Sequence, residues 1–322
     1  MSSNSAEIQS EKNPPNGLFY SILGQHPYIP FSPQKPRNAP SVNLNFTNNP
    51  SVSTILQSCN GLFLCGNKRS RTFYVYNPTT NRSTLLPEFR RGFPCGKTLA
   101  FDPVKSPYYK VVFVRYIVFD QFVRGLTYQI EIYSSEIGGW RIGGVMKSGK
   151  LQIDKGVYWN GSIHWLSTGL VGNSWRFHVD SQVFDEMPTP PVQLSSYWRG
   201  DNYFLESFDH LHFIEPGTQF NVYEMRRDYS EWFVKYCVDL SPVITAYGVP
   251  RGRHQYIFTK LALIRDEKDS ILVLRIPEKV LKYDLVDGSF EKLIEFEDYE
   301  VNGILRYLDA EGFQYIESLC CV

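Results

Sequence analysis

Short apolar runs separated by turn residues dominate the chain from residue 57 onward. Representative runs are GLFLC (61–65), TFYVYN (72–77), YQIEIYSS (128–135), SIHWLS (162–167) and VLKYDL (280–285). Runs of this length, rich in aromatic and β-branched residues and bounded by Gly, Pro, Asn or Asp, are typical of β-strands. No long segment shows a convincing 3.6-residue apolar period, which an amphipathic helix requires. The pattern therefore predicts an all-β protein.

One hairpin can be predicted in detail from GVYWNGSIHWLS (156–167). Asn160 and Gly161 form the strongest short-range hairpin signal, because both residues tolerate the positive φ of a type I′ turn. The turn then pairs Val157 with His164, Tyr158 with Ile163 and Trp159 with Ser162. One face carries Tyr158, Ile163 and Trp165, and the other carries Val157, Trp159 and His164. Because both faces carry large side chains, we expect the hairpin to lie between two other sheets.

The strand-like runs recur with a loose period of about 45–50 residues, which is the range of four-stranded propeller blades. The remaining length accommodates five to six blades or more, so the favoured architecture is a β-propeller. Two β-sandwich-like units are the alternative. Closure of a propeller requires the chain ends to meet. The strand-like terminal stretch FQYIESLCCV (313–322) is therefore expected to complete a sheet near the N-terminal part of the repeats.

The N-terminal part differs in composition, with many Ser, Asn and Pro residues before residue 57. We predict a disordered segment over 1–16 and a single interaction domain over 17–322. The N-terminus lacks the basic and apolar segments of a secretory signal, and no stretch approaches the ~20 apolar residues of a membrane span.

Charge and cysteine content narrow the function classes further. The chain has 33 basic and 33 acidic residues, so no global field favours nucleic acid or a membrane surface. Its 6 cysteines show no CxxC spacing, which argues against a zinc site and a dense disulfide framework. The expected location is the cytoplasm, the nucleus or both.

Histidines are the main candidates for chemistry, and each has a simpler interpretation. His210 and His212 share one strand face and could hold a metal, but no third and fourth ligands with recognised spacing accompany them. His164 has no identifiable nucleophile or orienting carboxylate and is interpreted as a packing residue. We therefore predict no catalytic, cofactor-binding or metal-binding residues, and no enzyme activity.

A family resemblance rests on an ordered set of motifs. In chain order they are SCNGLFLC, YVYNPTTNRSTLLP, LAFDPVKSPYYKVV, YQIEIYSSEIGGWR, GVYWNGSIHWLS, VYEMRRDYSEWFVKYCVDL, LVLRIPEKVLKYDL and YIESL. Together they resemble the F-box-associated, kelch-like interaction domain of the plant F-box protein family, over residues 17–322. The resemblance implies a propeller that binds a protein substrate as the receptor of an SCF-type (Skp1–cullin–F-box) ubiquitin ligase, in which another subunit performs the chemistry.

The N-terminus departs from that family pattern. Residues 1–56 contain no amphipathic helical pair with the Leu-Pro turns of an F-box, and the first tryptophan is Trp140. The segment resembles the linker that follows an F-box. Binding to the Skp1–cullin adaptor is therefore expected only if an F-box is supplied. The alternative is a free-standing interaction module without ligase function.

Two segments carry residue types that are enriched in interface hot spots. The first is PVQLSSYWRGDNY (191–203), although Trp198 could instead pack between blades. The second is VRYIVFDQFVRGLTY (114–128), which is expected to form a long loop. The candidate partner-binding residues are Tyr197, Trp198, Arg199, Phe119, Phe122 and Arg124.

Overall fold

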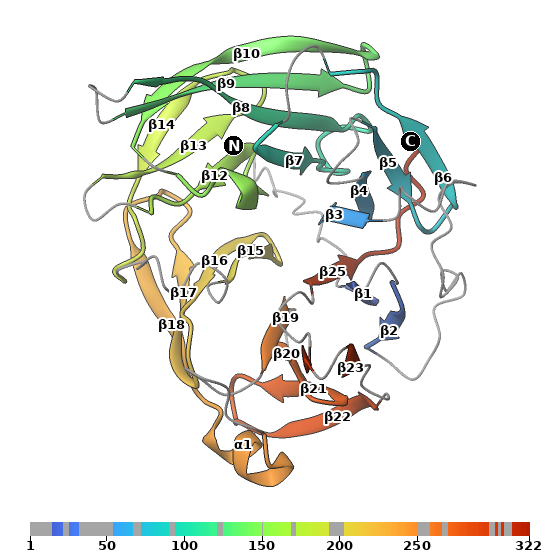
Figure 1. Ribbon diagram of the computed structural model, residues 1–322, viewed down its shortest axis with the longest axis vertical. Helices are drawn as coiled ribbons and strands as arrows, with labels where there is room; N and C mark the ends of the chain where they lie inside the picture. Colours follow the sequence, from blue (N-terminus) through green and yellow to red (C-terminus); the bar gives the residue numbers. More distant parts are fainter. Residues whose placement is uncertain are drawn as a thin grey trace, which may run out of the picture.

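The chain forms a six-bladed β-propeller of antiparallel sheets (Figure 1). This computed structural model describes residues 15–21, 26–31, 54–66, 72–89, 94–120, 125–149, 151–168, 172–192, 203–249, 258–265, 270–295, 300–301, 304–305 and 311–322. The predicted all-β propeller is confirmed, and the alternative of two β-sandwiches is wrong.

Five blades are four-stranded meanders that follow one another along the chain. Blade 1 contains β3 (Thr54–Cys59), β4 (Leu62–Gly66), β5 (Phe73–Asn77) and β6 (Arg82–Leu85). Blade 2 contains β7 (Gly96–Ala100), β8 (Lys110–Asp120), β9 (Gly125–Ser134) and β10 (Gly139–Ser148). Blade 3 contains β11 (Val157–Trp159), β12 (Ser162–Trp165), β13 (Ser174–His178) and β14 (Phe184–Met187). Blade 4 contains β15 (Tyr203–Ser207), β16 (His210–Ile214), β17 (Gln219–Met225) and β18 (Trp232–Asp239). Blade 5 contains β19 (Thr259–Arg265), β20 (Ser270–Ile276), β21 (Lys279–Asp284) and β22 (Phe290–Glu295).

The connections add little further regular structure. They contain a short 3₁₀ turn η1 (Ile153–Lys155), the helix α1 (Ser241–Tyr247) and a two-stranded hairpin of β23 (Glu300–Val301) and β24 (Ile304–Leu305). Among the helices of the described ranges, none is long and apolar enough to cross a membrane.

Blade 6 closes the ring with strands from both ends of the chain. Its order is β2 (Tyr28–Pro30), β1 (Gly17–Ser21) and β25 (Glu311–Tyr315). β25 is the innermost strand and contacts the innermost strands β19 and β3 on its two sides. The expectation that the C-terminal stretch completes a sheet is confirmed. Its partner, however, is β1, which precedes the repeats and pairs Gly17 with Tyr315.

The hairpin predicted at 156–167 is present with the predicted register. Val157 pairs with His164 and Trp159 with Ser162, and the turn residues Asn160 and Gly161 have φ values of 47° and 75°. Its two faces belong to two separate apolar clusters. Ile163 and Trp165 pack against blade 2, whereas Val157 and Trp159 pack against blade 4. Packing on both faces explains why these strands are apolar runs without alternation.

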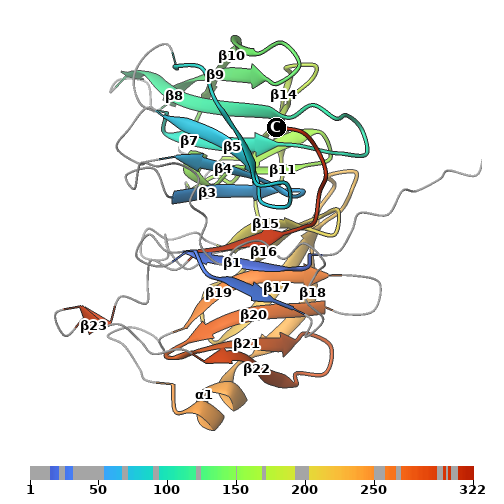
Figure 2. The same cartoon turned by 90° about the vertical axis from the view of Figure 1, so that its right-hand side faces the viewer.

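The ring has two unlike faces. In each four-stranded blade the innermost strand comes first, and these innermost strands are equivalent around the ring. The connection from the first strand to the second and the connection from the third strand to the fourth therefore lie on the same face of the ring. We call it the tail face, since it carries the turns at 60–61, 160–161 and 208–209 and the C-terminal tail, residues 316–322. Neighbouring turns are joined there, because the Trp159 indole donates to the carbonyl of Asp209 (2.8 Å). The opposite loop face carries the connections at 149–156, 215–218 and 277–278. Figure 2 shows the tail on the right and β23 on the left.

A buried asparagine fixes the tail to blade 1. The Asn77 amide donates to the carbonyls of Ser318 (3.0 Å) and Cys320 (2.7 Å), while its oxygen accepts from the backbone N–H of Thr79 (2.9 Å). The Asn77 side chain is fully buried, so its own atoms in these bonds are shielded from water. The tail is therefore part of the fold.

We expect Asn77→Asp to destabilise the protein by about 2–4 kcal/mol, because a buried carboxylate would face the carbonyls of Ser318 and Cys320 and could donate to neither. Urea unfolding followed by tryptophan fluorescence measures this. The matched control is Asn81→Asp on the same turn, where the exposed side chain only accepts from the Tyr76 hydroxyl (2.8 Å). That variant should stay within about 0.5 kcal/mol of the wild type. Equal effects of the two variants would contradict the anchoring role of Asn77.

Candidate functional site

The second blade extends an arm beyond its innermost strand. β7 pairs with β8 only as far as Gly96 opposite Val114, whereas β8 and β9 continue together to Asp120 opposite Gly125. We call the described residues 115–120 and 125–129 the arm. Figure 2 shows the end of β8 on the same side as β23, so the arm points to the loop face.

The arm corrects the expectation of a long loop over 114–128. Residues 114–120 and 125–128 belong to β8 and β9, and only the four residues between these strands connect them. The reason is the composition of VRYIVF, in which aromatic and β-branched residues favour a paired strand. A hairpin holds its side chains more firmly than a loop would.

Two large side chains stand exposed at the base of the arm, next to a β-bulge between Tyr116 and Val118. Tyr116 is 50% exposed and Ile117 is 43% exposed. The Tyr116 ring lies 5.3 Å from that of Tyr128, which is buried, so one side of Tyr116 is fixed. An exposed side chain that is already packed on one side can bind a partner with little loss of conformational entropy.

An ion pair supports the arm from within the blade. Arg115 lies 3.2 Å from the carboxylate of Glu131, whose side chain is 6% exposed, and Arg115 also donates to Gln129. Burying Glu131 without a cation would cost several kcal/mol, so this pair holds β8 and β9 in register at the point where β7 ends.

The structure does not describe the side chains of the predicted partner-binding residues. Phe119 lies in β8 opposite Leu126, but its side chain, Phe122 and Arg124 lie outside the described residues. Tyr197, Trp198 and Arg199 also lie outside them, in the connection between β14 and β15. Connections between blades lie at the loop face, so the end of β14 and the start of β15 lie there. The end of β8 and the start of β9, which flank residues 121–124, lie at the same face. Sequence reasoning missed Tyr116 and Ile117, although both are within the quoted segment, because a continuous apolar run gives no sign of which residues are exposed.

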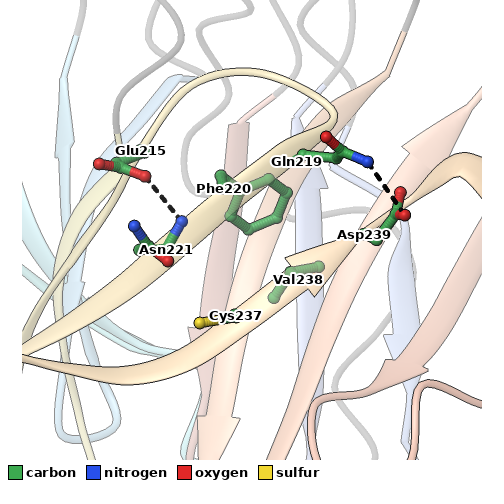
Figure 3. Close-up of a pocket in the computed structure, with 7 residues that line it drawn as sticks. All are labelled: Glu215, Gln219, Phe220, Asn221, Cys237, Val238 and Asp239. Carbon is green, nitrogen blue, oxygen red and sulfur yellow. Dashed lines mark hydrogen bonds between the residues drawn. The ribbon is translucent and has the colours of Figure 1, made fainter.

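A shallow pocket of about 370 Å³ lies at the loop-face end of blade 4 (Figure 3). Its walls are Glu215, Gln219, Phe220, Asn221, Cys237, Val238 and Asp239. The Glu215 carboxylate accepts from the backbone N–H of Asn221 (2.7 Å) and the Tyr223 hydroxyl (3.0 Å). The Asp239 carboxylate accepts from the Gln219 amide (3.1 Å) and the Ser241 N–H (2.8 Å), and these bonds lower its pKa. The pocket is thus lined by hydrogen-bond acceptors that are held in place by their neighbours.

His164 is a buried structural residue, as predicted. Its Nδ1 donates to the carbonyl of Val157 (3.1 Å) and its Nε2 accepts from the Tyr229 hydroxyl (3.0 Å). The guanidinium of Arg176 lies 3.9 Å from the centre of the Tyr229 ring, on which the imidazole is also stacked. Burial lowers the pKa of His164 to about 3, so the ring is neutral at physiological pH. Tyr229 comes from blade 4 and fastens it to blade 3.

His210 and His212 lie against a single buried carboxylate. Both contact the buried carboxylate of Glu224, at 3.1 Å and 3.4 Å respectively, and Lys235 lies 3.7 Å from the same group. Within the part of the chain that the structure describes, no group of three or more His, Cys, Asp or Glu side chains could hold a metal ion.

Three side chains of blade 3 are arranged in the order of a catalytic triad. Ser162 Oγ lies 3.1 Å from His178 Nδ1, and His178 Nε2 lies 3.0 Å from the Asp185 carboxylate. Sequence reasoning missed this line because its members come from three different strands of blade 3. A nucleophile must reach its substrate, however, and Ser162 is fully buried. The three side chains therefore stabilise the blade.

Comparisons with known proteins place this geometry in a family. The model of the F-box associated beta propeller domain matches residues 31–211. F-box protein At5g07610 of Arabidopsis thaliana is 32% identical over 317 residues, covering 89% of this chain and 74% of that protein. The putative F-box protein At3g17490 of the same plant is 26% identical over 152 residues, covering 46% and 37%.

Similarity to solved structures is weaker. A chain of the nidogen/laminin complex matches with a TM-score of 0.49 and 11% identity, over 93% of this chain and 98% of that one. The identification therefore rests on the sequence matches, supported by the six-bladed architecture. The chain belongs to the F-box-associated β-propeller family.

Proposed function

We propose that this propeller is a non-catalytic recognition module that holds a protein substrate on its loop face. We further propose that it serves as the substrate-recognition part of an SCF-type ubiquitin ligase, in the cytoplasm or nucleus. The observation that carries the proposal is the arm of blade 2, which presents Tyr116 and Ile117 in a propeller of the F-box-associated family.

The arm has the properties of an interface anchor. Tyrosine is enriched in binding hot spots, and a paired strand supplies a rigid support for it. The candidate residues Phe119, Phe122, Arg124, Tyr197, Trp198 and Arg199 belong to the same proposed surface. The blade 4 pocket adds hydrogen-bond acceptors at the same face. Loops positioned by a rigid scaffold are common recognition sites.

Proximity labelling with the intact chain tests the surface. We expect Tyr116→Ser/Ile117→Ser to lose partners that the wild type labels. The matched control is Val286→Ser, which changes a residue that is 75% exposed in the turn between β21 and β22, on the tail face. Partner sets that are unchanged in the arm variant, or lost equally in the control, would contradict the proposed surface.

The ligase role needs a separate test, in which the chain and its fusion to an intact F-box are each co-purified with Skp1 and cullin-1. We expect the fusion to form the complex and to ubiquitinate the partners that depend on Tyr116. A fusion that assembles with Skp1 but does not ubiquitinate those partners would instead support a free-standing interaction module.

A further inference from the structure

Asn-Gly pairs occur at several places in the chain, and the structure gives them unlike surroundings. The sequence contains such pairs at 16–17, 60–61, 160–161 and 302–303, and the last of these lies outside the described residues. An asparagine side chain can react with the backbone nitrogen of the next residue, and glycine hinders this approach least because it has no Cβ. The contacts of each pair therefore decide which one reacts in the folded protein.

The pair at 160–161 is open to this reaction. Asn160 is exposed at the turn between β11 and β12, and a Cβ on Gly161 would meet nothing within 4 Å. The Asn160 side chain interacts with the hydroxyl of Tyr229 from blade 4. The Gly161 carbonyl accepts from the Val179 N–H (3.1 Å), but this oxygen takes no part in the reaction. The turn thus has room to change its backbone conformation at the reacting bond.

The pair at 60–61 provides the comparison, because it has the same two residues in the same kind of turn. Asn60 and Gly61 have φ values of 45° and 91°, both positive as at 160–161. Here the side-chain amide donates to the carbonyl of Phe101 (2.6 Å), in the connection that follows β7. A Cβ on Gly61 would lie 2.5 Å from the Cβ of Ser318, so the C-terminal tail packs directly on this glycine. These two contacts hold the side chain and the backbone of the pair in place.

The pair at 16–17 is held by strand pairing. The Asn16 side-chain oxygen accepts from the N–H of Glu317 (2.9 Å). Gly17 belongs to β1 and lies between Tyr315 of β25 and Pro30 of β2. Backbone rotation at this pair therefore requires that blade 6 opens, which is a much rarer event than the opening of an exposed turn.

We infer that Asn160 is a site of spontaneous succinimide formation in the folded protein. The backbone nitrogen of Gly161 gives its proton to solvent hydroxide and attacks Cγ of Asn160, which closes a five-membered ring. The side-chain nitrogen takes a proton from water and leaves as ammonia. A further water molecule then adds to either ring carbonyl and opens the ring. The products at position 160 are an aspartate and an isoaspartate, and the net reaction consumes one water molecule and releases one ammonia.

The two products differ in their effect on blade 3. In an isoaspartate the main chain runs through the former side chain, so a turn whose length sets the pairing of Val157 with His164 gains one backbone atom. An aspartate keeps the length of the turn, and Arg176 and Arg227, which both act on the neighbouring Tyr229, lie close to its charge. Isoaspartate is therefore the product that disturbs the blade. This chemistry is separate from the proposed substrate recognition and does not depend on it.

Peptide mapping of the intact wild-type chain tests the assignment. The folded protein is incubated at slightly alkaline pH, and mass spectrometry with electron-based fragmentation measures aspartate and isoaspartate at each pair. We expect position 160 to react at least about tenfold faster than positions 60 and 16. In concentrated urea, which removes the contacts of the folded state, the three rates should agree within about threefold. Equal rates at positions 160 and 60 in the folded chain would overturn the assignment, as would an excess at 160 that persists in urea.

Asn160→Asp separates the effects of the two products. This variant is expected to unfold at the temperature of the fresh wild type, because the turn keeps its length. The isoaspartate fraction, purified from the aged protein, is expected to unfold at a lower temperature. An isoaspartate fraction that unfolds with the transition of the fresh wild type would contradict the effect on blade 3.

Discussion

Removal of residues 311–322 is expected to abolish cooperative unfolding, because it removes the innermost strand of blade 6. β25 supplies Phe313 and Tyr315 to the core, where they are 6% and 0% exposed, and it separates blades 1 and 5. Loss of a single buried aromatic side chain typically costs about 3–5 kcal/mol, and the total stability of a domain is only about 5–15 kcal/mol. Thermal unfolding followed by near-ultraviolet circular dichroism would show no sharp transition.

A single residue provides a graded version of this test. A Cβ at Gly312 would collide with the carbonyl oxygen of Leu261 in β19, so Gly312→Ala is expected to destabilise the protein by about 3 kcal/mol. The matched control is Gly139→Ala, where a Cβ meets nothing within 4 Å. A truncated chain that unfolds with the transition of the full chain would show that the ring does not depend on β25.

Stability is expected to fall steeply below pH 6.5 because of His164. The folded protein holds this ring neutral, with a pKa of about 3, whereas in the unfolded chain the imidazole has its ordinary pKa of 6.5. The unfolded state therefore binds the extra proton first, and the stabilisation present above pH 6.5 is lost as the pH falls towards 3. The slope approaches about 1.4 kcal/mol per pH unit, or about 2–3 kcal/mol between pH 6.5 and 4.5.

Comparison with His164→Gln isolates this contribution, because carboxylates titrate similarly in both proteins. Urea unfolding at pH 6.5 and pH 4.5 should show a smaller loss in the variant by about 2–3 kcal/mol. Tyr229→Phe is the matched control, since it removes the hydroxyl bound to Nε2 but leaves the imidazole buried and the pH dependence in place. Parallel pH profiles of the wild type and His164→Gln would refute the assignment.

Local signals in the sequence predicted much of the fold. At the Asn-Gly pairs 60–61 and 160–161 both residues have positive φ, and the register from Val157 to His164 follows from the turn alone. The repeat length predicted the blades because each blade is one supersecondary unit. The predicted propeller topology implied that the C-terminal strand closes the ring. It did not identify β1 as the partner of β25, because long-range strand pairing depends on the geometry of the whole ring.

The proposed recognition surface was harder to predict for the same reason. In a propeller both faces of a strand are covered, so the apolar run around Tyr116 gives no indication of where β7 ends and the arm begins. The Arg115–Glu131 ion pair joins two strands, and the hydrogen bond from the Tyr229 hydroxyl to His164 joins two blades. Neither leaves a local signature. Predictions of exposed contact residues require the relative lengths of neighbouring strands, which only the structure provides.

We have proposed that the chain recognises a protein through the arm on its loop face. Site-specific photo-crosslinking tests it most directly, with a photoreactive amino acid at Tyr116 in the intact chain and at Val286 as the comparison. We expect a small set of proteins to be captured at position 116 but not at position 286, and we expect Ile117→Ser to abolish this capture. Identical captures at the two positions, or capture at 116 that survives Ile117→Ser, would contradict it.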